Sequence, residues 1–347
     1  MLVREVKALA GKWVSENASQ LPGFMGGFFR GSLTEAHDDT EFPISSDLDL
    51  TLVFEGALPE SPLKEVHYYG VIIGGGFWPV TRLQPLERVL SDYRIGYSFR
   101  LPHVLPGASD KLCEMAAAVS RNFPKRHWVM KRIEDARANC LKYVNFVSEF
   151  DSEFDKVLAW LWAAGITTHI ILAAALRNPT IRKRYLAARE VLSQYGHLDF
   201  YEFLLTLQGS HHFDSATTQT HFHNAIEVFD VACEVCHKPF PYSSEIKLAS
   251  RPKLINGTQE LITKSFHRES VFWIVATYAR CLRAFEHIGA LSHLDRFRPG
   301  FEHILDDLGI KSLSDLGPRT EQVKASIPHA MAIAQLILEA HPTIEDS

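Results

Sequence analysis

The first third of the chain alternates apolar and polar residues over short segments. In residues 47–55, leucines at every second position alternate with aspartate and threonine, which predicts a strand with one apolar and one polar face. Shorter strands are expected at residues 26–30, 65–73 and 98–105. Apolar residues at three- and four-residue intervals predict helices over residues 2–18 and 85–92, with one or two helical turns at 32–37.

The rest of the chain has fewer glycines and a different spacing of apolar residues. Eleven of the 20 glycines precede residue 100, and helical spacing dominates after Pro124. Helices are expected at residues 125–150, 153–176, 182–195, 217–236, 258–287 and 322–340. We therefore expect an α+β fold with two domains, a mixed sheet with helices at residues 1–122 and an all-helical bundle at residues 123–347.

Composition and charge exclude several classes of protein. Hydrophobic residues make up 46% of the 347-residue chain, which is enough for a core of normal size and excludes global disorder. The 36 basic and 41 acidic residues leave a net charge of −5, so generic binding to nucleic acid is not expected. The first ten residues lack the apolar core of a secretory signal. The apolar stretch at residues 157–177 is expected to be a buried helix pair rather than a membrane span. Five cysteines, an odd number, favour reduced thiols and a cytoplasmic location.

The candidate chemistry lies in two short motifs. Asp47 and Asp49, two residues apart on a strand, would project toward one face with their backbones about 7 Å apart. A divalent cation between the carboxylates would relieve their repulsion, and oxygen ligands suit Mg²⁺. Gly31 and Ser32 open a short helical segment, where backbone N–H groups and a hydroxyl can hold phosphate. Together the two motifs predict a site for a nucleoside triphosphate with Mg²⁺.

The order of these motifs resembles the nucleotidyltransferase superfamily typified by polymerase β and the kanamycin nucleotidyltransferases. The matching segments are residues 29–32 (Phe-Arg-Gly-Ser) and residues 46–50 (Ser-Asp-Leu-Asp-Leu). The resemblance covers residues 24–56, continues more loosely to residue 105, and is compatible with a helical domain that follows. It implies a nucleotidyltransferase-type sheet at the N-terminus.

The resemblance also implies roles for individual residues. Asp47 and Asp49 would be the catalytic metal ligands, and Gly31 and Ser32 would hold the β- and γ-phosphates. Arg30 and Ser46 are further candidates for nucleotide binding. The implied reaction transfers a nucleoside monophosphate, with ATP as the first choice of donor. Its acceptor would be a hydroxyl of a small molecule, for example an antibiotic-like one, and pyrophosphate would be released. Other basic residues expected near the triphosphate are Lys64, Arg82, Arg94 and Arg100.

One position departs from the family pattern. Relatives place a third carboxylate on a neighbouring strand, and here that position falls at about Gly74. Loss of a general base typically lowers the rate 10²–10⁴-fold. Glu65 and Asp110 are the nearest acids that could substitute. Two alternatives therefore stay open: a catalytically degenerate protein that binds nucleotide as a scaffold, and a transferase that modifies a protein hydroxyl.

Other motifs carry weaker signals. Cys233, Cys236 and His237 have the spacing of a haem-attachment motif, but buried thiols in a helix are favoured over haem or zinc. The pairs at residues 211–212 and 221–223 make this region rich in histidine, and we favour an inter-helix loop followed by a helix start over a metal site there. The acidic run at residues 151–155 is interpreted as a helix N-terminus rather than an acceptor pocket. Apolar helical faces make a homodimer plausible.

Overall fold

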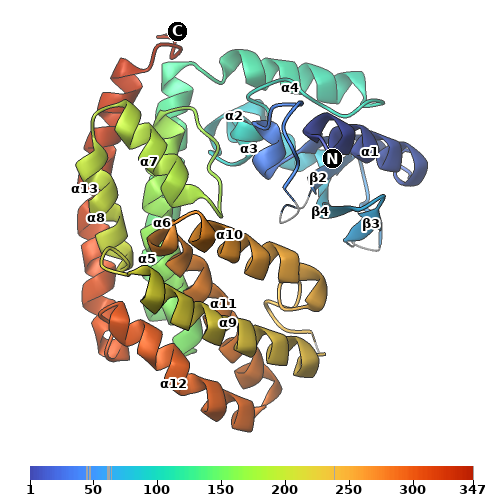
Figure 1. The fold of residues 1–347 in the computed structure, drawn as a ribbon. Coiled ribbons are helices and arrows are strands. Elements are labelled where there is room, and N and C mark those ends of the chain that lie inside the picture. Colours follow the sequence, from blue (N-terminus) through green and yellow to red (C-terminus); the bar gives the residue numbers. More distant parts are fainter. Residues whose placement is uncertain (44–45, 47, 61–62, 64, 238, 347) are drawn as a thin grey trace. The chain divides into compact units, whose positions relative to one another are not determined.

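The computed structural model describes residues 1–43, 46, 48–60, 63, 65–237 and 239–346. It is an α+β protein, with a small mixed sheet near the N-terminus followed by a helical region (Figure 1). Contacts divide it into unit 1 (Met1–Asp135, Leu172–Thr180 and Ala334–Ser347) and unit 2 (Ala136–Ile171 and Ile181–Ile333). The chain crosses between the units several times, three of them within the helices α5 (Arg126–Glu149), α6 (Glu153–Ala174) and α13 (Leu316–Ala340). The expected domain division at residues 122 and 123 stays a prediction.

The sheet of unit 1 has four strands in the order β1-β2-β4-β3. The strands are β1 (Phe24–Phe29), β2 (Leu48–Phe54), β3 (Val66–Tyr68) and β4 (Val71–Pro79). The pair β2–β4 is parallel, while β1–β2 and β3–β4 are antiparallel. Because β1 and β2 are antiparallel neighbours, the end of β1 and the start of β2 meet at one end of the sheet. Phe29 and Arg30 leave the sheet at that end, and Leu48 and Asp49 enter it there.

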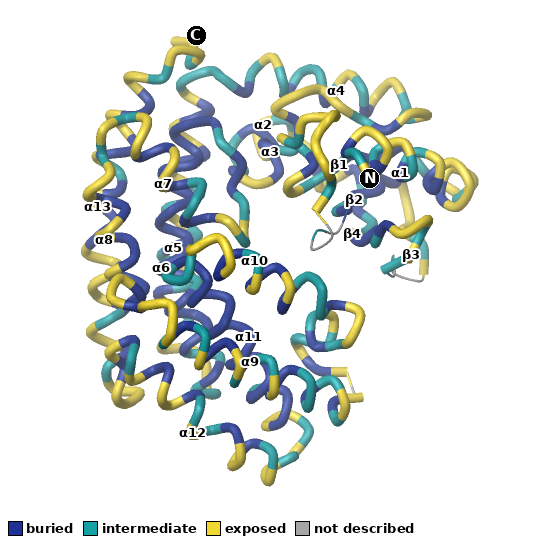
Figure 2. The backbone as a smooth tube through the Cα atoms, viewed as in Figure 1, coloured by how far each residue is buried: buried dark blue, intermediate teal, exposed yellow. Residues whose placement is uncertain are grey.

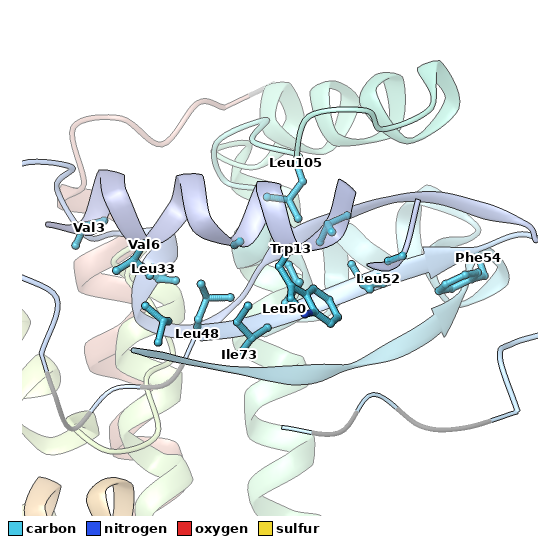
Figure 3. Close-up of a cluster of buried hydrophobic side chains, with 14 residues drawn as sticks. Val3, Val6, Trp13, Leu33, Leu48, Leu50, Leu52, Phe54, Ile73 and Leu105 are labelled. Atoms are coloured by element: carbon cyan, nitrogen blue, oxygen red, sulfur yellow. The ribbon is translucent and has the colours of Figure 1, made fainter. Parts of the chain in front are cut away.

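Helices cover both faces of this sheet. The apolar stripe of α1 (Val3–Asn17) packs on Leu48, Leu50, Leu52 and Ile73, as the alternation in residues 47–55 predicts (Figure 3). On the other face, Phe28, Val53 and Trp78 form a second core with residues of α2 and α4. The remaining short elements of unit 1 are η1 (Gly31–Thr34), η2 (Val80–Leu83), α2 (Leu86–Ser91), α3 (Ile95–Ser98) and α4 (Asp110–Asn122).

Two of the expected strands are wrong. Residues 65–73 are not one strand, because Tyr69 and Gly70 both adopt positive φ and turn the chain between β3 and β4. The three consecutive glycines lie inside β4, whereas the sequence interpretation ends the strand before them. Residues 98–105 contain no strand, because α3 occupies the start and Pro102 lacks the N–H that a ladder needs.

Unit 2 is helical. Its elements, beyond parts of α5, α6 and α13, are α7 (Arg184–Gln194), α8 (Leu198–Gln208), α9 (Ser215–Val235), η3 (Leu248–Ser250), η4 (Pro252–Asn256), α10 (Gly257–Thr263), α11 (His267–Ile288), α12 (Leu291–Asp307) and η5 (Leu313–Asp315). Helix α11 is buried along most of its length and packs against α9, α10 and α12 (Figure 2). The expected helix at residues 258–287 is two helices, because Ser265 adopts positive φ between α10 and α11.

Helix α6 is long and apolar enough to cross a membrane. Its 18-residue apolar window is 94% buried by the rest of the protein, as in a core helix. The expected helix pair is one continuous helix, because Gly165 and Thr167 do not interrupt its hydrogen bonding. Its first turn contains Glu153 and Asp155, which confirms a helix N-terminus there. Both acids are paired within unit 2, Glu153 with Arg298 and Asp155 with Arg283.

Candidate functional site

The candidate nucleotide site lies where β1 ends and β2 begins. The backbone N–H of Arg30 donates to the carbonyl oxygen of Asp49 at 2.9 Å, which extends the antiparallel pairing by one residue. Ser46 is half-buried, and its N–H donates to the carbonyl oxygen of Pro43 at 2.9 Å. Asp47 lies outside the described residues. Among the residues expected at the site, the structure therefore brings Arg30 and Asp49 together at this end of the sheet.

Gly31 packs directly against the carboxylate of Asp49. Its φ is +65°, and a Cβ at this position would lie 3.0 Å from Asp49 Oδ2. A glycine therefore satisfies both the backbone conformation and the close approach. Gly31 begins η1, and Ser32 is exposed in its first turn. The start of η1 thus lies next to a carboxylate, a group that can bind a metal ion.

A segment far along the sequence holds this loop in place. In unit 1, Asn178 Nδ2 donates to the carbonyl oxygen of Gly31 at 2.9 Å, and the Asn178 N–H donates to Glu35 Oε1 at 3.0 Å. The hydroxyl of Tyr97 donates to the same carboxylate, and Arg177 lies 3.8 Å from it. Burial and the charge of Glu35 raise the pKa of Tyr97, so the hydroxyl stays protonated and remains a donor. Sequence reasoning missed this anchor, because residues 172–180 are distant in sequence and carry no motif.

We expect Asn178→Asp to weaken unit 1 more than Asn178→Ala. Alanine removes one hydrogen bond to Gly31, which costs about 1 kcal/mol of unfolding free energy. Aspartate also places a carboxylate against a carbonyl oxygen and near Glu35, which adds repulsion. Urea denaturation followed by circular dichroism measures both variants. Equal stability of the aspartate variant and the parent would contradict the anchoring role.

Two arginines contact one indole ring, and one of them, Arg30, is the residue whose backbone pairs with Asp49. The guanidinium carbons of Arg30 and Arg82 lie 5.1 Å and 3.8 Å from the ring centroid of Trp78. Burial lowers the pKa of Arg30, the charges of Asp49 and Asp92 raise it, and those of Arg82 and Arg94 lower it. The three arginines exceed the carboxylates of Asp49 and Asp92 by one charge, and Arg82 and Arg94 are exposed, so an added anion such as phosphate is favoured here. The indole holds both guanidinium groups by cation–π contact.

Another expected basic residue, Arg100, lies near Tyr97. The charge of Arg100 lowers the pKa of the Tyr97 hydroxyl. Burial and the charge of Glu35 raise the same pKa by more. Lys64 lies outside the described residues. Arg82 and Arg94 are thus the expected basic residues whose charges act on Arg30, the backbone partner of Asp49.

The position of the missing carboxylate is next to Asp49. In the parallel register of β2 and β4, Gly74 is the direct partner of Asp49. In the antiparallel register of β3 and β4, Val66 pairs with Ile73, so Glu65 follows opposite Gly74. Partners across neighbouring strands project toward the same face, so Asp49 and Gly74 lie side by side, and Glu65 directly precedes β3 on the other side of β4. Gly74 is buried although it has no side chain, and Glu65 Oε2 is shielded from solvent.

Asp110, the other candidate substitute, lies at the opposite end of the sheet. The N–H of Ser109, which precedes it, donates to the carbonyl of Met25 at 2.7 Å, and Met25 is near the start of β1. Lys111 pairs there with Glu55, just after the end of β2. Asp110 is therefore too far along the strands to replace a carboxylate beside Asp49, and this expectation is wrong.

The cysteine motif has the properties of buried structural thiols. Cys233 lies in the last turn of α9, Cys236 caps that helix, and both are free. Burial raises the pKa of Cys233 to about 12 and that of Cys236 to about 11. Thiols that stay protonated at neutral pH are poor metal ligands.

Finally, no protein-family model matches the chain, and no curated protein matches it.

Proposed function

We propose that unit 1 binds a nucleoside triphosphate with Mg²⁺ and transfers its nucleoside monophosphate to a hydroxyl of a small molecule. The observation that carries this proposal is the packing of Gly31 against the Asp49 carboxylate, with Arg30 beside it. In a nucleotidyltransferase-type sheet, the same end holds the metal and the phosphates. Carboxylate oxygens are the ligands that Mg²⁺ prefers, so the donor set fits the ion.

The proposed roles follow from the chemistry of each side chain. Asp49, together with Asp47, would hold Mg²⁺, and the ion would neutralise charge on the triphosphate. The exposed Ser32 and the N–H groups that open η1 would bind the β- and γ-phosphates. Arg30 and Arg82 would supply positive charge to the departing pyrophosphate.

The transfer itself needs a proton acceptor. The hydroxyl oxygen of the small molecule would attack the α-phosphorus. The bond between the α-phosphorus and the oxygen that bridges it to the β-phosphate would break, and pyrophosphate would leave. The proton of the hydroxyl would pass to a base near Asp49. We propose Glu65 for this role, because it directly precedes β3 and a continued register would place it opposite Gly74, the partner of Asp49.

Removing the Glu65 carboxylate tests the proposed base. Pyrophosphate release is measured with each triphosphate and a panel of polyhydroxy and aminoglycoside-type acceptors. We expect Glu65→Gln to slow release about 100-fold or more, with ATP binding nearly unchanged. Adding Gly74→Glu to that variant is expected to restore much of the rate, and Gly74→Ala serves as the steric control.

Gly74 also favours a second function, nucleotide binding without transfer. In that case the parent would bind ATP with Mg²⁺ but release no pyrophosphate with any acceptor, and Glu65→Gln would change nothing. Release that is unaffected by Glu65→Gln would exclude Glu65 as the base while leaving the transferase function in place.

A further inference from the structure

Three potential metal ligands meet between two helices of unit 2. His303 and Asp307 are four residues apart on α12, so they lie on one face of that helix. His221 lies on α9, which packs against α12. His221 Nε2 is 2.6 Å from Asp307 Oδ2, and His303 Nε2 is 3.8 Å from the same oxygen. One ligand atom from each residue lies within 4.8 Å of the others.

The spacing and the donor types suit one class of ion. Bonds of about 2.0–2.1 Å in a tetrahedral zinc site place neighbouring ligand atoms roughly 3.3 Å apart. The observed separations bracket that value, so small side-chain rotations would complete the coordination. Two imidazoles with one carboxylate favour first-row transition metals, whereas Mg²⁺ prefers oxygen ligands alone. This donor set differs from that of the proposed nucleotide site.

The three side chains of the cluster differ in their exposure to solvent. The His221 side chain is 1% exposed and is held by packing, while that of His303 is 60% exposed and that of Asp307 31%. An ion can therefore reach the cluster from solvent and keep water in the remaining coordination positions.

We propose that His221, His303 and Asp307 bind a divalent transition-metal ion that links α9 to α12. When bound, the ion holds these two helices together and stabilises unit 2. Because its ligands are separate from Asp49, the site operates whether or not unit 1 binds nucleotide. Nothing in the sequence pattern connects α9 with α12, so the structure alone assigns this site.

The test is a zinc titration of tag-free, metal-stripped protein, with calorimetry and thermal unfolding as readouts. We expect the parent to bind one zinc ion and to unfold at a higher temperature when zinc is present. His303→Ala is expected to weaken binding at least 10-fold and to abolish the shift in unfolding temperature, and Asp307→Asn is expected to act similarly. His303 is exposed, so its replacement leaves the zinc-free unfolding temperature close to that of the parent.

A matched control lies on the same helix as His221. His223 is exposed two residues further along α9, and His223→Ala is expected to bind zinc like the parent. Cobalt substitution distinguishes the histidine site from the thiols of Cys233 and Cys236, because cobalt–thiolate bonds give intense charge-transfer absorption. Three results would each overturn the proposal: no binding at submillimolar zinc, binding that survives His303→Ala, or a cobalt–thiolate band.

Discussion

Asp49→Asn is expected to abolish the Mg²⁺-dependent part of ATP binding. Asparagine keeps the size of the side chain but removes the charge that holds a hard cation. We expect affinity for ATP with Mg²⁺ to fall about 100-fold or more, equivalent to about 2.8 kcal/mol of binding free energy. Without Mg²⁺, the loss of a negative charge next to Gly31 and Arg30 is expected to leave ATP binding unchanged or tighter. Displacement of a fluorescent ATP analogue, with and without Mg²⁺, measures both effects.

The control for this variant is Glu55→Gln. Glu55 follows β2 at the opposite end of the sheet, where it pairs with Lys111 at 2.8 Å. The Glu55→Gln substitution removes one carboxylate of unit 1 that is not part of the candidate site, so we expect ATP binding to match that of the parent. Equal losses in the two variants would show a general effect of charge. Parent-like binding by Asp49→Asn would mean that Asp49 holds no metal.

Gly75→Ala is expected to destabilise unit 1 severely. Gly75 lies within β4 at φ +141°, and a Cβ there would lie 1.7 Å from the carbonyl oxygen of Leu50 in β2. Backbone atoms in a paired strand cannot move aside without breaking the sheet. Backbone strain at a positive φ and overpacking each cost roughly 1–3 kcal/mol, so we expect the free energy of unfolding to fall by about 3 kcal/mol or more.

The next glycine provides a matched comparison. A Cβ at Gly76 would meet nothing within 4 Å, so Gly76→Ala is expected to stay within about 0.5 kcal/mol of the parent. Urea denaturation and limited proteolysis, with cleavage sites mapped to unit 1, compare the two variants. Similar stability of both would contradict the close approach of β4 to β2 at Gly75.

Periodicity predicted the parts of the fold in which one surface is buried. The leucines at residues 48, 50 and 52 form the buried face of β2, and the stripe of α1 covers them. The placement of Gly74 on the strand beside Asp49 also follows from the order of strands. In these segments local pattern and burial agree, so the sequence carries enough information.

The failures come from turns and from long-range packing. A two-residue turn at Tyr69 and Gly70 split an expected strand, because two residues with positive φ reverse the chain without changing its apolar pattern. The anchor at Asn178 and the cluster of His221 with His303 and Asp307 join segments far apart in sequence. No local signal could have found those contacts. The cytoplasmic location and the homodimer stay predictions.

The most direct test of the account is calorimetric titration of the unmodified protein with ATP, GTP, CTP and UTP, each with and without Mg²⁺. We predict saturable binding of at least one triphosphate, strengthened by Mg²⁺ because Asp49 and Asp47 would then hold the ion against the phosphates. Failure of all four triphosphates to bind in the presence of Mg²⁺ would contradict a nucleotide site at the end of β1 and the start of β2.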